Sequence, residues 1–468
     1  MRFSALARRT KYQLDSRCSV VIEPGRREEM PVMKRWVISA ALVSALIVVT
    51  SAAWSQANLG LAEAPAEQVG MSSPKLDRIH DAFKQEVDQG KLGGTVVLVA
   101  RKSKVVYADA VGFQDKEEGK PMTLDALFRI YSMTKPLVSV GAMMLVEDGK
   151  IQLTDPVSKF FPAFKRQLVS VARIDAEFAR VTYASVPADR EMTVHDLLRH
   201  TSGLAYGEIT QNAPVKEAYA KAALYLPGVR DFDTRDVTPA EEVDRLAKAP
   251  LAHQPGTVWG YGLSVDLLGR VVEAVSGKRL EDFLDERLFK PLKMNDTSFW
   301  VTSSKAGRLA QPLAVDAATA QPIKLIDVST EPKNDSGGAG GISTAADYLR
   351  FAQMLLNGGQ LDGMRLLSRT TVALMTADHL GTRIETGALP TNNPGYTFGL
   401  GFAVRQGAGI AGVAGSTGEF TWGGYAGTYF WVDPKEELVG VYMSQAPGPL
   451  GAHYRRLVKQ LVYAAIAD

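Results

Sequence analysis

Segments typical of β-strands gather at both ends of this 468-residue chain, and segments typical of helices lie between them. Near one end, residues 93–100 and 105–113 are rich in β-branched side chains and flank a polar turn, which predicts a hairpin. Near the other end, further strands are predicted at residues 398–404, 419–422, 428–432 and 439–444, followed by a helix at 455–467. We therefore predict an α+β fold in which an antiparallel sheet from both chain ends is flanked by helices.

The same pattern predicts how the chain divides into domains. Residues 58–115 and 336–468 form an α/β domain, and residues 116–335 form a mainly helical domain inserted between its two parts. A composition of 46% hydrophobic and 22% charged residues is that of a globular chain with a large core. Helices are predicted at residues 74–89, 193–199, 264–276 (closed by Gly277), 281–289 and 345–356 (capped by Thr344).

Residues 1–57 differ from the rest and predict an N-terminal extension with a secretory signal peptide. Two basic residues precede the uncharged residues 36–50, and small residues follow, with cleavage predicted after Ala53 or Ala57. The apolar stretch is short for a transmembrane helix, although an uncleaved anchor is the alternative. Cys18 is the only cysteine, so no disulfide framework is expected. We expect a periplasmic or secreted protein.

The charge of the chain argues against a nucleic-acid partner. Residues 1–57 hold 9 of the 53 basic and 4 of the 51 acidic residues, so 44 and 47 remain and the net formal charge is −3. No basic stripe is left that would bind phosphates. After signal cleavage, no stable membrane insertion is expected either.

Residues 128–145 carry the pattern that predicts a function. Ser132 and Lys135 precede an apolar, uncharged run with Pro136 near its start, which predicts a buried helix. Residues three apart share one helix face, so the amine lies beside the hydroxyl. A serine needs a neighbouring base to act as a nucleophile, and a lysine serves when burial or positive charge lowers its pKa. The chemistry indicated is acyl transfer through an acyl-serine.

Other interpretations of these and other residues remain open at this point. Ser-x-x-Lys is a loose pattern, and a second copy, Ser72 to Lys75, opens a polar helix where the serines suit a helix cap. The chain has no Gly-x-Ser-x-Gly elbow, and we interpret His200, beside a glycine after a short helix, as a structural cap. The histidines are scattered without a His-Glu-x-x-His pattern, so no metal is expected.

Five motifs in a fixed order resemble those of one superfamily. The chain looks like the serine β-lactamases and penicillin-binding proteins over residues 70–465, and is most similar to class C β-lactamases and family VIII carboxylesterases. The resemblance implies a β-lactamase/transpeptidase-like fold. The motifs are Ser132-Met133-Thr134-Lys135, residues 195–204, Pro255-Gly256-Thr257 before Tyr261, residues 337–347 with 351–356, and Trp422-Gly423-Gly424.

Two departures from the superfamily pattern favour an esterase. Leu263 stands where the Tyr-x-Asn motif has asparagine, and Trp422 stands where β-lactamases carry the lysine that binds a substrate carboxylate. An indole cannot bind a carboxylate as a cation does. The resemblance therefore implies a carboxylesterase acting on small or medium acyl esters. The alternatives are a β-lactamase, a D-Ala-D-Ala carboxypeptidase or D-aminopeptidase-like amidase, an acyltransferase, and a non-catalytic binder of cell-wall fragments.

The resemblance also implies roles for particular residues. Ser132 is the nucleophile, and Lys135 with Tyr261 moves its proton. The backbone N–H groups of Ser132 and Tyr425 hold the oxyanion, and Gly423 and Gly424, after Trp422, let that strand approach the substrate. A small ester or amide is the expected partner, and no metal or organic cofactor is needed.

Overall fold

The computed structural model describes residues 59–175, 180–225, 235–386 and 394–468, all within one compact unit, Ala57–Asp468. The predicted signal peptide and Cys18 lie outside the described residues and stay predictions. Within the described ranges, no helix has the length and apolar character needed to cross a membrane.

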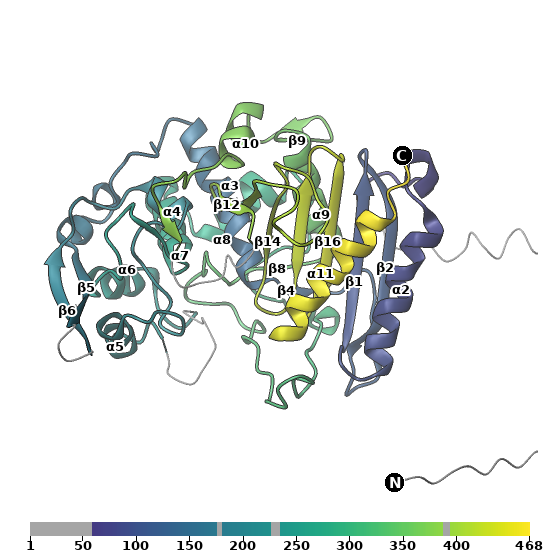
Figure 1. The fold of residues 1–468 in the computed structure, drawn as a ribbon, viewed down its shortest axis with the longest axis horizontal. Helices are drawn as coiled ribbons and strands as arrows, with labels where there is room; N and C mark the ends of the chain where they lie inside the picture. Colours follow the sequence, from purple (N-terminus) through teal and green to yellow (C-terminus); the bar gives the residue numbers. More distant parts are fainter. Residues whose placement is uncertain (1–58, 176–179, 226–234, 387–393) are drawn as a thin grey trace, which may run out of the picture. The chain divides into compact units, whose positions relative to one another are not determined.

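One large antiparallel sheet is built from both ends of the chain (Figure 1). Its strands, in spatial order, are β12 (Tyr396–Phe398), β13 (Ala403–Arg405), β14 (Phe420–Gly423), β15 (Tyr429–Asp433), β16 (Leu438–Ser444), β1 (Gly94–Arg101), β2 (Lys104–Asp115) and β3 (Lys120–Pro121). The two chain ends meet where β1 pairs with β16, with Val97 opposite Tyr442. The predicted α+β fold is confirmed.

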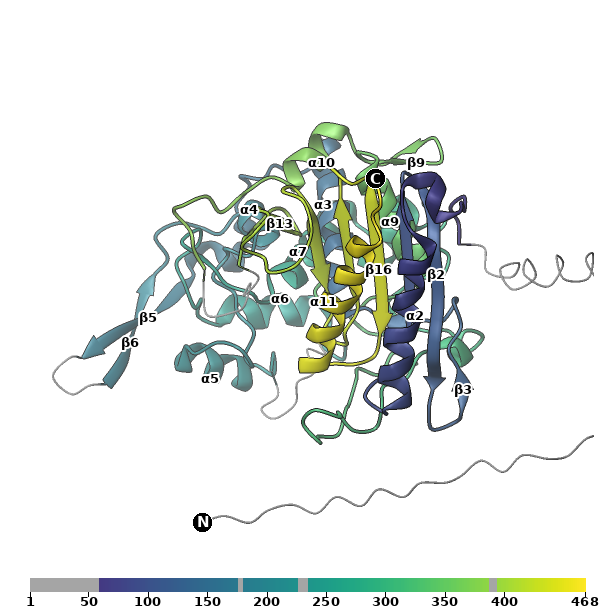
Figure 2. The ribbon, with the colours of Figure 1, turned by 45° about the vertical axis from the view of Figure 1, so that its right-hand side comes forward.

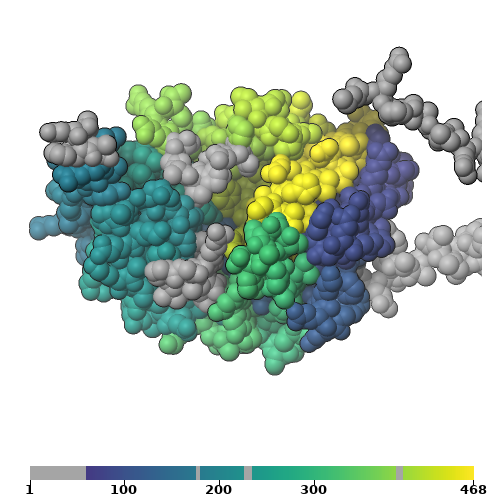
Figure 3. All heavy atoms as spheres, turned by 60° about the horizontal axis from the view of Figure 1, so that its bottom comes forward, coloured from purple at the N-terminus to yellow at the C-terminus, as the bar shows by residue number. Residues whose placement is uncertain are grey.

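Helices cover both faces of this sheet. On one face, α2 (Ser73–Asp88) and α11 (Pro449–Ala464) lie side by side, and Phe83 and Val458 pack between them and the sheet (Figure 2). In Figure 3 the same two segments form neighbouring purple and yellow surfaces. On the other face, α9 (Ala345–Leu356) places the ring of Tyr348 4.9 Å from that of Phe430.

The middle of the chain is mainly helical, as predicted, but it also contains a hairpin that the sequence analysis missed. Strands β5 (Leu168–Asp175) and β6 (Arg180–Pro187) form this hairpin, which extends away from the helices (Figure 2). The predicted domain boundaries stay a prediction. The helices are α4 (Val194–Leu198), α5 (Ala213–Lys221), α6 (Pro239–Lys248), α7 (Ser264–Ser276) and α8 (Leu280–Leu284), with α10 (Arg369–Met375) nearer the C-terminus.

Three further pairs of short strands lie outside the large sheet. Strand β4 lies directly before the Ser132 segment and pairs with β8, which follows the glycine bend at residues 337–341. This pairing brings two motifs that are far apart in the sequence next to each other. The strands are β4 (Phe128–Arg129) with β8 (Ile342–Ser343), β7 (Val258–Trp259) with β11 (Glu385–Thr386), and β9 (Gln360–Leu361) with β10 (Met364–Arg365).

Two predicted elements differ from the structure. The single strand predicted at 398–404 is wrong, because Gly399 N donates to Phe402 O at 2.8 Å and Gly401 has a φ of 95°, so a turn separates β12 from β13. Helix α11 begins at Pro449, six residues before the predicted start at 455, because proline suits the first turn. By contrast, α7 has the predicted bounds and Gly277 closes it with a φ of 70°.

Helix α3 (Thr134–Glu147) follows a short 3-10 turn, Tyr131–Met133, that contains Ser132. Every residue of α3 from Thr134 to Leu145 is buried, and the helix packs against α7 and α8. The prediction of a buried helix after Ser132 is therefore confirmed. The turn that carries the serine is therefore continuous with a buried helix.

The segment that leads into α4 is held by one buried carboxylate, Asp196. Its oxygens accept hydrogen bonds from Arg190 at 2.6 and 2.9 Å, from Thr193 N at 2.9 Å and from Thr201 Oγ1 at 2.8 Å. Thr193 and Asp196 form the capping box of α4. Burial by itself raises the pKa of Asp196, but Arg190 and these donors outweigh it and lower the pKa to about 2.

Asp196→Asn should destabilise the protein by about 2 kcal/mol at pH 7, because an acid with a lowered pKa stabilises the fold when ionised. That contribution is present above the ordinary aspartate pKa near 4 and is lost as the pH falls towards about 2. Urea unfolding of both proteins at pH 7, 4 and 2.5 measures the difference. Asp244→Asn, which breaks an exposed pair with Lys248, is the control and should cost less than about 0.5 kcal/mol. A difference for Asp196→Asn that does not change with pH would contradict this account.

Candidate active site

Ser132 lies in a turn whose backbone is held from several sides. Tyr131, directly before it, has a φ of 43°, a left-handed conformation that is costly for a residue with a side chain. The hydroxyl of Tyr131 accepts a hydrogen bond from Ile326 N at 2.9 Å, and its ring lies 5.4 Å from the ring of Tyr425. On the other side, Tyr348 Oη donates to Met133 O at 2.9 Å. These contacts keep the serine in a fixed orientation.

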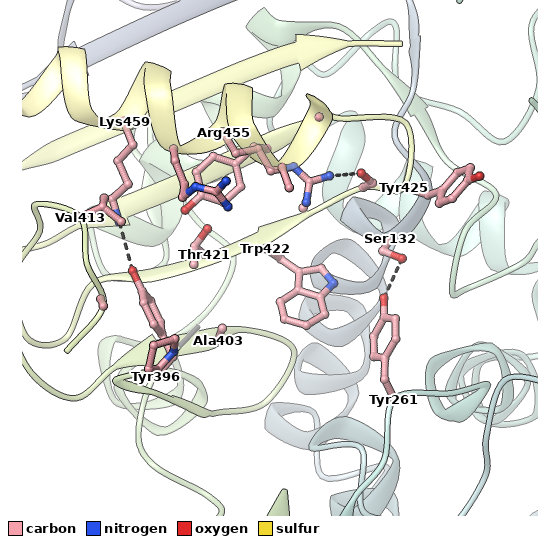
Figure 4. Close-up of a pocket in the computed structure, with 18 of the residues that line it drawn as sticks. Ser132, Tyr261, Tyr396, Ala403, Val413, Thr421, Trp422, Tyr425, Arg455 and Lys459 are labelled. Atoms are coloured by element: carbon pink, nitrogen blue, oxygen red, sulfur yellow. Dashed lines mark hydrogen bonds between the residues drawn. The ribbon is translucent and has the colours of Figure 1, made fainter. Parts of the chain in front are cut away.

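Two of the predicted partners reach the hydroxyl of Ser132. Tyr261 Oη donates to Ser132 Oγ at 2.6 Å (Figure 4), and Lys135 Nζ donates to it at 3.2 Å. Tyr261 lies in the short loop between β7 and α7, and Lys135 lies in the first turn of α3. The structure thus brings Ser132, Lys135 and Tyr261 together. The phenol of Tyr261 and the amine of Lys135 both bind Ser132 Oγ.

Lys135 is buried, with 1% of its surface exposed, and its ammonium group is fully hydrogen-bonded. Besides Ser132, Nζ donates to Tyr206 Oη at 3.0 Å and to Gly338 O at 2.7 Å. These three acceptors match the three hydrogens of an ammonium group. Burial, followed by the charge of Asp266, raises the pKa of Tyr206 well above 10, so Tyr206 is a phenol at neutral pH. The sequence analysis assigned Tyr206 no role.

Asp266 supports the carbonyl group that Lys135 binds. Its Oδ1 accepts hydrogen bonds from Ser336 Oγ at 2.6 Å and from Gly338 N at 3.0 Å. A Cβ on Gly338 would lie 2.2 Å from Asp266 Oδ2, so only glycine allows this approach. The buried carboxylate therefore fixes the glycine bend against Lys135. The sequence contains little indication of this role for Asp266, since an acidic residue in the first turn of a helix is common.

Aromatic rings surround Tyr261. The ring of His200 lies 5.0 Å from it and that of Trp422 5.5 Å, while Trp259 stacks at 6.0 Å with an interplanar angle of 13°. Burial, and then the charge of Lys135, lowers the pKa of His200 well below its usual value, so this histidine is neutral. Its carbonyl accepts a hydrogen bond from Gly260 N at 2.9 Å, which fits the structural role expected for it.

Trp422 forms one wall of the site beside Tyr261. Its ring also lies 5.2 Å from the ring of Phe398, and its Nε1 has no hydrogen-bond partner among the described residues. Leu263, the other departure from the superfamily motif, is buried just before α7. Neither position offers a positive charge to a substrate.

The turn between β14 and β15 approaches the Ser132 turn closely. Gly424 N donates to Thr428 O at 2.9 Å, and a Cβ on Gly424 would lie 2.1 Å from Ile130 O. A side chain at this position would therefore push the two turns apart. Tyr425 follows at the tip of the hairpin and lies near Ser132 (Figure 4). The predicted role of Gly423 and Gly424, which is to let this strand approach the substrate, stays a prediction.

Ser132 and Tyr261 open into a cavity of about 550 Å³. Its wall is mostly aromatic and small side chains, and its charged residues are all basic: Arg455, Arg456 and Lys459 of α11. Lys459 is paired with the buried Glu419, and Arg455 binds backbone carbonyls. The sequence analysis did not place α11 at the site, because the cavity forms only after both chain ends have joined. The apolar lining residues include Ile209, Trp259, Tyr396, Ala403, Ala411, Val413, Trp422, Tyr425 and Ala452.

No group of three or more His, Cys, Asp or Glu side chains that could hold a metal occurs in the part of the chain that the structure describes. His195 and His379 form a pair, and their ring nitrogens lie 2.9 Å apart. The pair is not part of the Ser132 site, because neither histidine lines the cavity that contains Ser132.

The beta-lactamase family model matches residues 79–464. The chain belongs to the beta-lactamase family. It is 31% identical over 378 residues to esterase EstB of Burkholderia gladioli, covering 76% of this chain and 86% of EstB. It is 28% identical over 406 residues to the lovastatin esterase of Penicillium rubens, covering 81% and 95% of the two chains. These matches confirm the predicted superfamily and its esterase-like relatives.

A solved structure agrees with the fold as well. EstCE1, described as a hydrolase with promiscuous acyltransferase activity, superposes with a TM-score of 0.67 at 28% identity, over 83% of this chain and 99% of that one. The chain is thus a hydrolase of the beta-lactamase family, with esterases among its relatives.

Gly424→Ala should slow covalent labelling of Ser132 by an alkyl fluorophosphonate about 100-fold, the usual effect of losing one oxyanion donor. The added methyl clashes with Ile130 O and moves the hairpin away from the serine. Intact-protein mass spectrometry over time gives the labelling rate. Gly307→Ala is the control, because its Cβ would meet only Lys120 Nζ, at 3.7 Å. Equal labelling rates for the two variants would show that the close approach is not needed.

Proposed function

We propose that this protein is a carboxylesterase that hydrolyses small or medium acyl esters through an acyl-Ser132 intermediate. One observation carries the proposal: Ser132 Oγ lies 2.6 Å from Tyr261 Oη and 3.2 Å from Lys135 Nζ at the end of a largely apolar cavity. A nucleophile with a proton acceptor in direct contact is the requirement of covalent acyl transfer. The esterase relatives support the choice of substrate.

Acylation begins when Ser132 Oγ forms a bond to the ester carbonyl carbon and gives its proton to Tyr261 Oη. This step requires Tyr261 in its phenolate form, in which the direction of the 2.6 Å hydrogen bond is reversed and Ser132 Oγ donates to Tyr261 Oη. Lys135 stabilises the phenolate, because Nζ lies 4.6 Å from the Tyr261 ring centroid. The carbonyl electron pair moves to the oxygen, and the N–H groups of Ser132 and Tyr425 stabilise the resulting charge. The intermediate then collapses, the bond to the alkoxy oxygen breaks, and Tyr261 returns the proton so that an alcohol leaves.

Deacylation repeats these steps with water. Tyr261 takes a proton from water as its oxygen bonds to the acyl carbon, and Ser132 Oγ leaves and recovers the proton. The products are a carboxylic acid and free Ser132. His200 takes no part, because its ring is enclosed by aromatic rings and neither ring nitrogen has a hydrogen-bond partner among the described residues.

The residues around the serine favour an ester over a β-lactam or a D-Ala-D-Ala peptide. Both of the latter substrates carry a carboxylate, and the superfamily binds it with the lysine that Trp422 replaces. Of the basic residues that line the cavity, Lys459 is already paired with Glu419 and Arg455 is directed at backbone carbonyls, while Arg456 is exposed. An apolar wall at Trp422 lowers the cost of placing uncharged acyl groups beside Ser132.

Ser132→Ala should reduce hydrolysis of p-nitrophenyl butyrate by the full-length protein to background, because it removes the hydroxyl that contacts both Tyr261 Oη and Lys135 Nζ. The thermal midpoint should stay within a few degrees of wild type, since a hydroxyl is the only loss. Release of p-nitrophenol and a thermal melt measure the two quantities. Near-wild-type turnover by this variant would rule out Ser132 as the nucleophile.

Trp422→Lys should retain measurable hydrolysis of p-nitrophenyl butyrate and raise the relative kcat/KM for mono-p-nitrophenyl glutarate about tenfold. The reason is that a hydrogen bond to a charged group contributes about 1.5 kcal/mol or more. Trp422→Phe removes the indole without adding charge and is the matched control. A loss of stability in Trp422→Lys with no change in this preference would mean that Trp422 acts only in packing.

A further inference from the structure

Arg455 of α11 binds the turn between β14 and β15. Its guanidinium donates to Gly427 O, with Nε at 3.2 Å, and to Gly424 O through Nη2 (Figure 4). The side chain lines the cavity that contains Ser132, and burial lowers the pKa of Arg455 without removing its charge at neutral pH. In the described part of the chain, the groups whose charge acts on the pKa of Arg455 are tyrosines, not carboxylates. Its positive charge is therefore directed at two peptide carbonyls.

One of these carbonyls belongs to the peptide group that provides the proposed oxyanion donor. Gly424 O and Tyr425 N are the two ends of a single peptide unit. No described peptide bond is cis, and in a trans peptide the C=O and N–H bonds point in opposite directions. The Arg455 guanidinium and Gly427 N, which donates to Gly424 O at 3.0 Å, together fix the direction of the Gly424 carbonyl and therefore also that of the Tyr425 N–H.

We propose that Arg455 is a positioning residue for the oxyanion site: it orients and polarises the Gly424–Tyr425 peptide so that its N–H stabilises the charge that develops on the substrate at Ser132. This inference rests on the proposed function, since it takes the Tyr425 N–H as the donor. A cation on the carbonyl oxygen draws electron density from the peptide and strengthens its N–H as a donor, and burial enlarges the effect.

The two glycines before Tyr425 make room for neighbours on opposite sides of the chain, Gly423 for Arg455 and Gly424 for the Ser132 turn. A Cβ on Gly423 would lie 2.7 Å from Arg455 Nη1, and a Cβ on Gly424 would lie 2.1 Å from Ile130 O. Gly423 therefore leaves room for the guanidinium, and Gly424 leaves room for the Ser132 turn. The peptide that follows lies between the cation and the nucleophile. A planar fork with several N–H groups can bind two carbonyls at once, which a lysine cannot do in the same way.

The test compares Arg455→Met and Arg455→Gln with wild type in the full-length protein, using p-nitrophenyl butyrate. For Arg455→Met, kcat should fall at least about tenfold while KM stays within about twofold, because the interaction acts only when the oxyanion forms. The inhibition constant of a trifluoromethyl ketone, whose adduct on Ser132 carries an oxyanion, should rise by the same factor. Arg455→Gln keeps a neutral donor and should lie between Arg455→Met and wild type.

Controls separate this role from a general effect on the fold. Arg78→Met removes an exposed arginine on α2 and should leave kcat and the ketone affinity unchanged. Arg455→Ala should regain kcat when methylguanidine is added, which a variant that cannot fold would not do. A change in KM alone, an unchanged ketone affinity, or an absence of rescue in folded Arg455→Ala would overturn the inference.

The outcomes also distinguish this inference from the proposed function. If Ser132→Ala retained activity, the esterase mechanism would fail and Arg455 would have no oxyanion site to support. If wild-type turnover depended on Ser132 but Arg455→Met kept both kcat and ketone affinity, only the role of Arg455 would be wrong.

Discussion

The pairing of β1 with β16 is the interaction on which the rest of the structure depends. It joins parts of the chain that are far apart, and Thr95 Oγ1 adds a side-chain hydrogen bond to Met443 O, 348 residues later, at 2.8 Å. Closing so long a loop costs only slightly more entropy than closing a short one, so the sheet can be completed from both ends. Once β16 is in place, β15 and β14 follow in order and bring Trp422, Gly424 and Tyr425 to the Ser132 turn.

The Ser132 turn is in effect the meeting point of the sheet and the helical part. Helix α3 fixes it from one side, and Tyr348 of α9 and the glycine bend at residues 337–341 fix it from others, through Met133 O and Lys135 Nζ. None of these contacts comes from a flexible, exposed side chain. A site that must hold a hydroxyl within a few tenths of an ångström of its partners benefits from such support.

The sequence predicted the fold class and the turn that holds Ser132, because period-2 and helical patterns are local signals that survive in the folded chain. It also named Ser132, Lys135 and Tyr261, which the structure brings together, whereas their chemical roles stay predictions. Asp266 and Arg455 could not be found in this way. In the sequence, Asp266 looks like a common acidic residue in the first turn of a helix. Arg455 looks like a common basic residue on an amphipathic helix. Their positions depend on contacts with the glycine bend and the β14–β15 turn, which only the completed fold creates.

The two Ser-x-x-Lys sequences show why the pattern alone does not make a nucleophile. Ser72 and Lys75 open α2, where neither residue is buried and the neighbouring Ser73 hydroxyl is hydrogen-bonded to Glu67 at 3.0 Å. Water competes for every group there, so a lysine beside a serine has no reason to exchange a proton with it. Ser132 and Lys135 have the same spacing, but the lysine is enclosed and its three hydrogen bonds go to fixed acceptors. The difference lies in burial and in Tyr261, which comes from another element, so the chemistry is a property of the packed fold rather than of the motif.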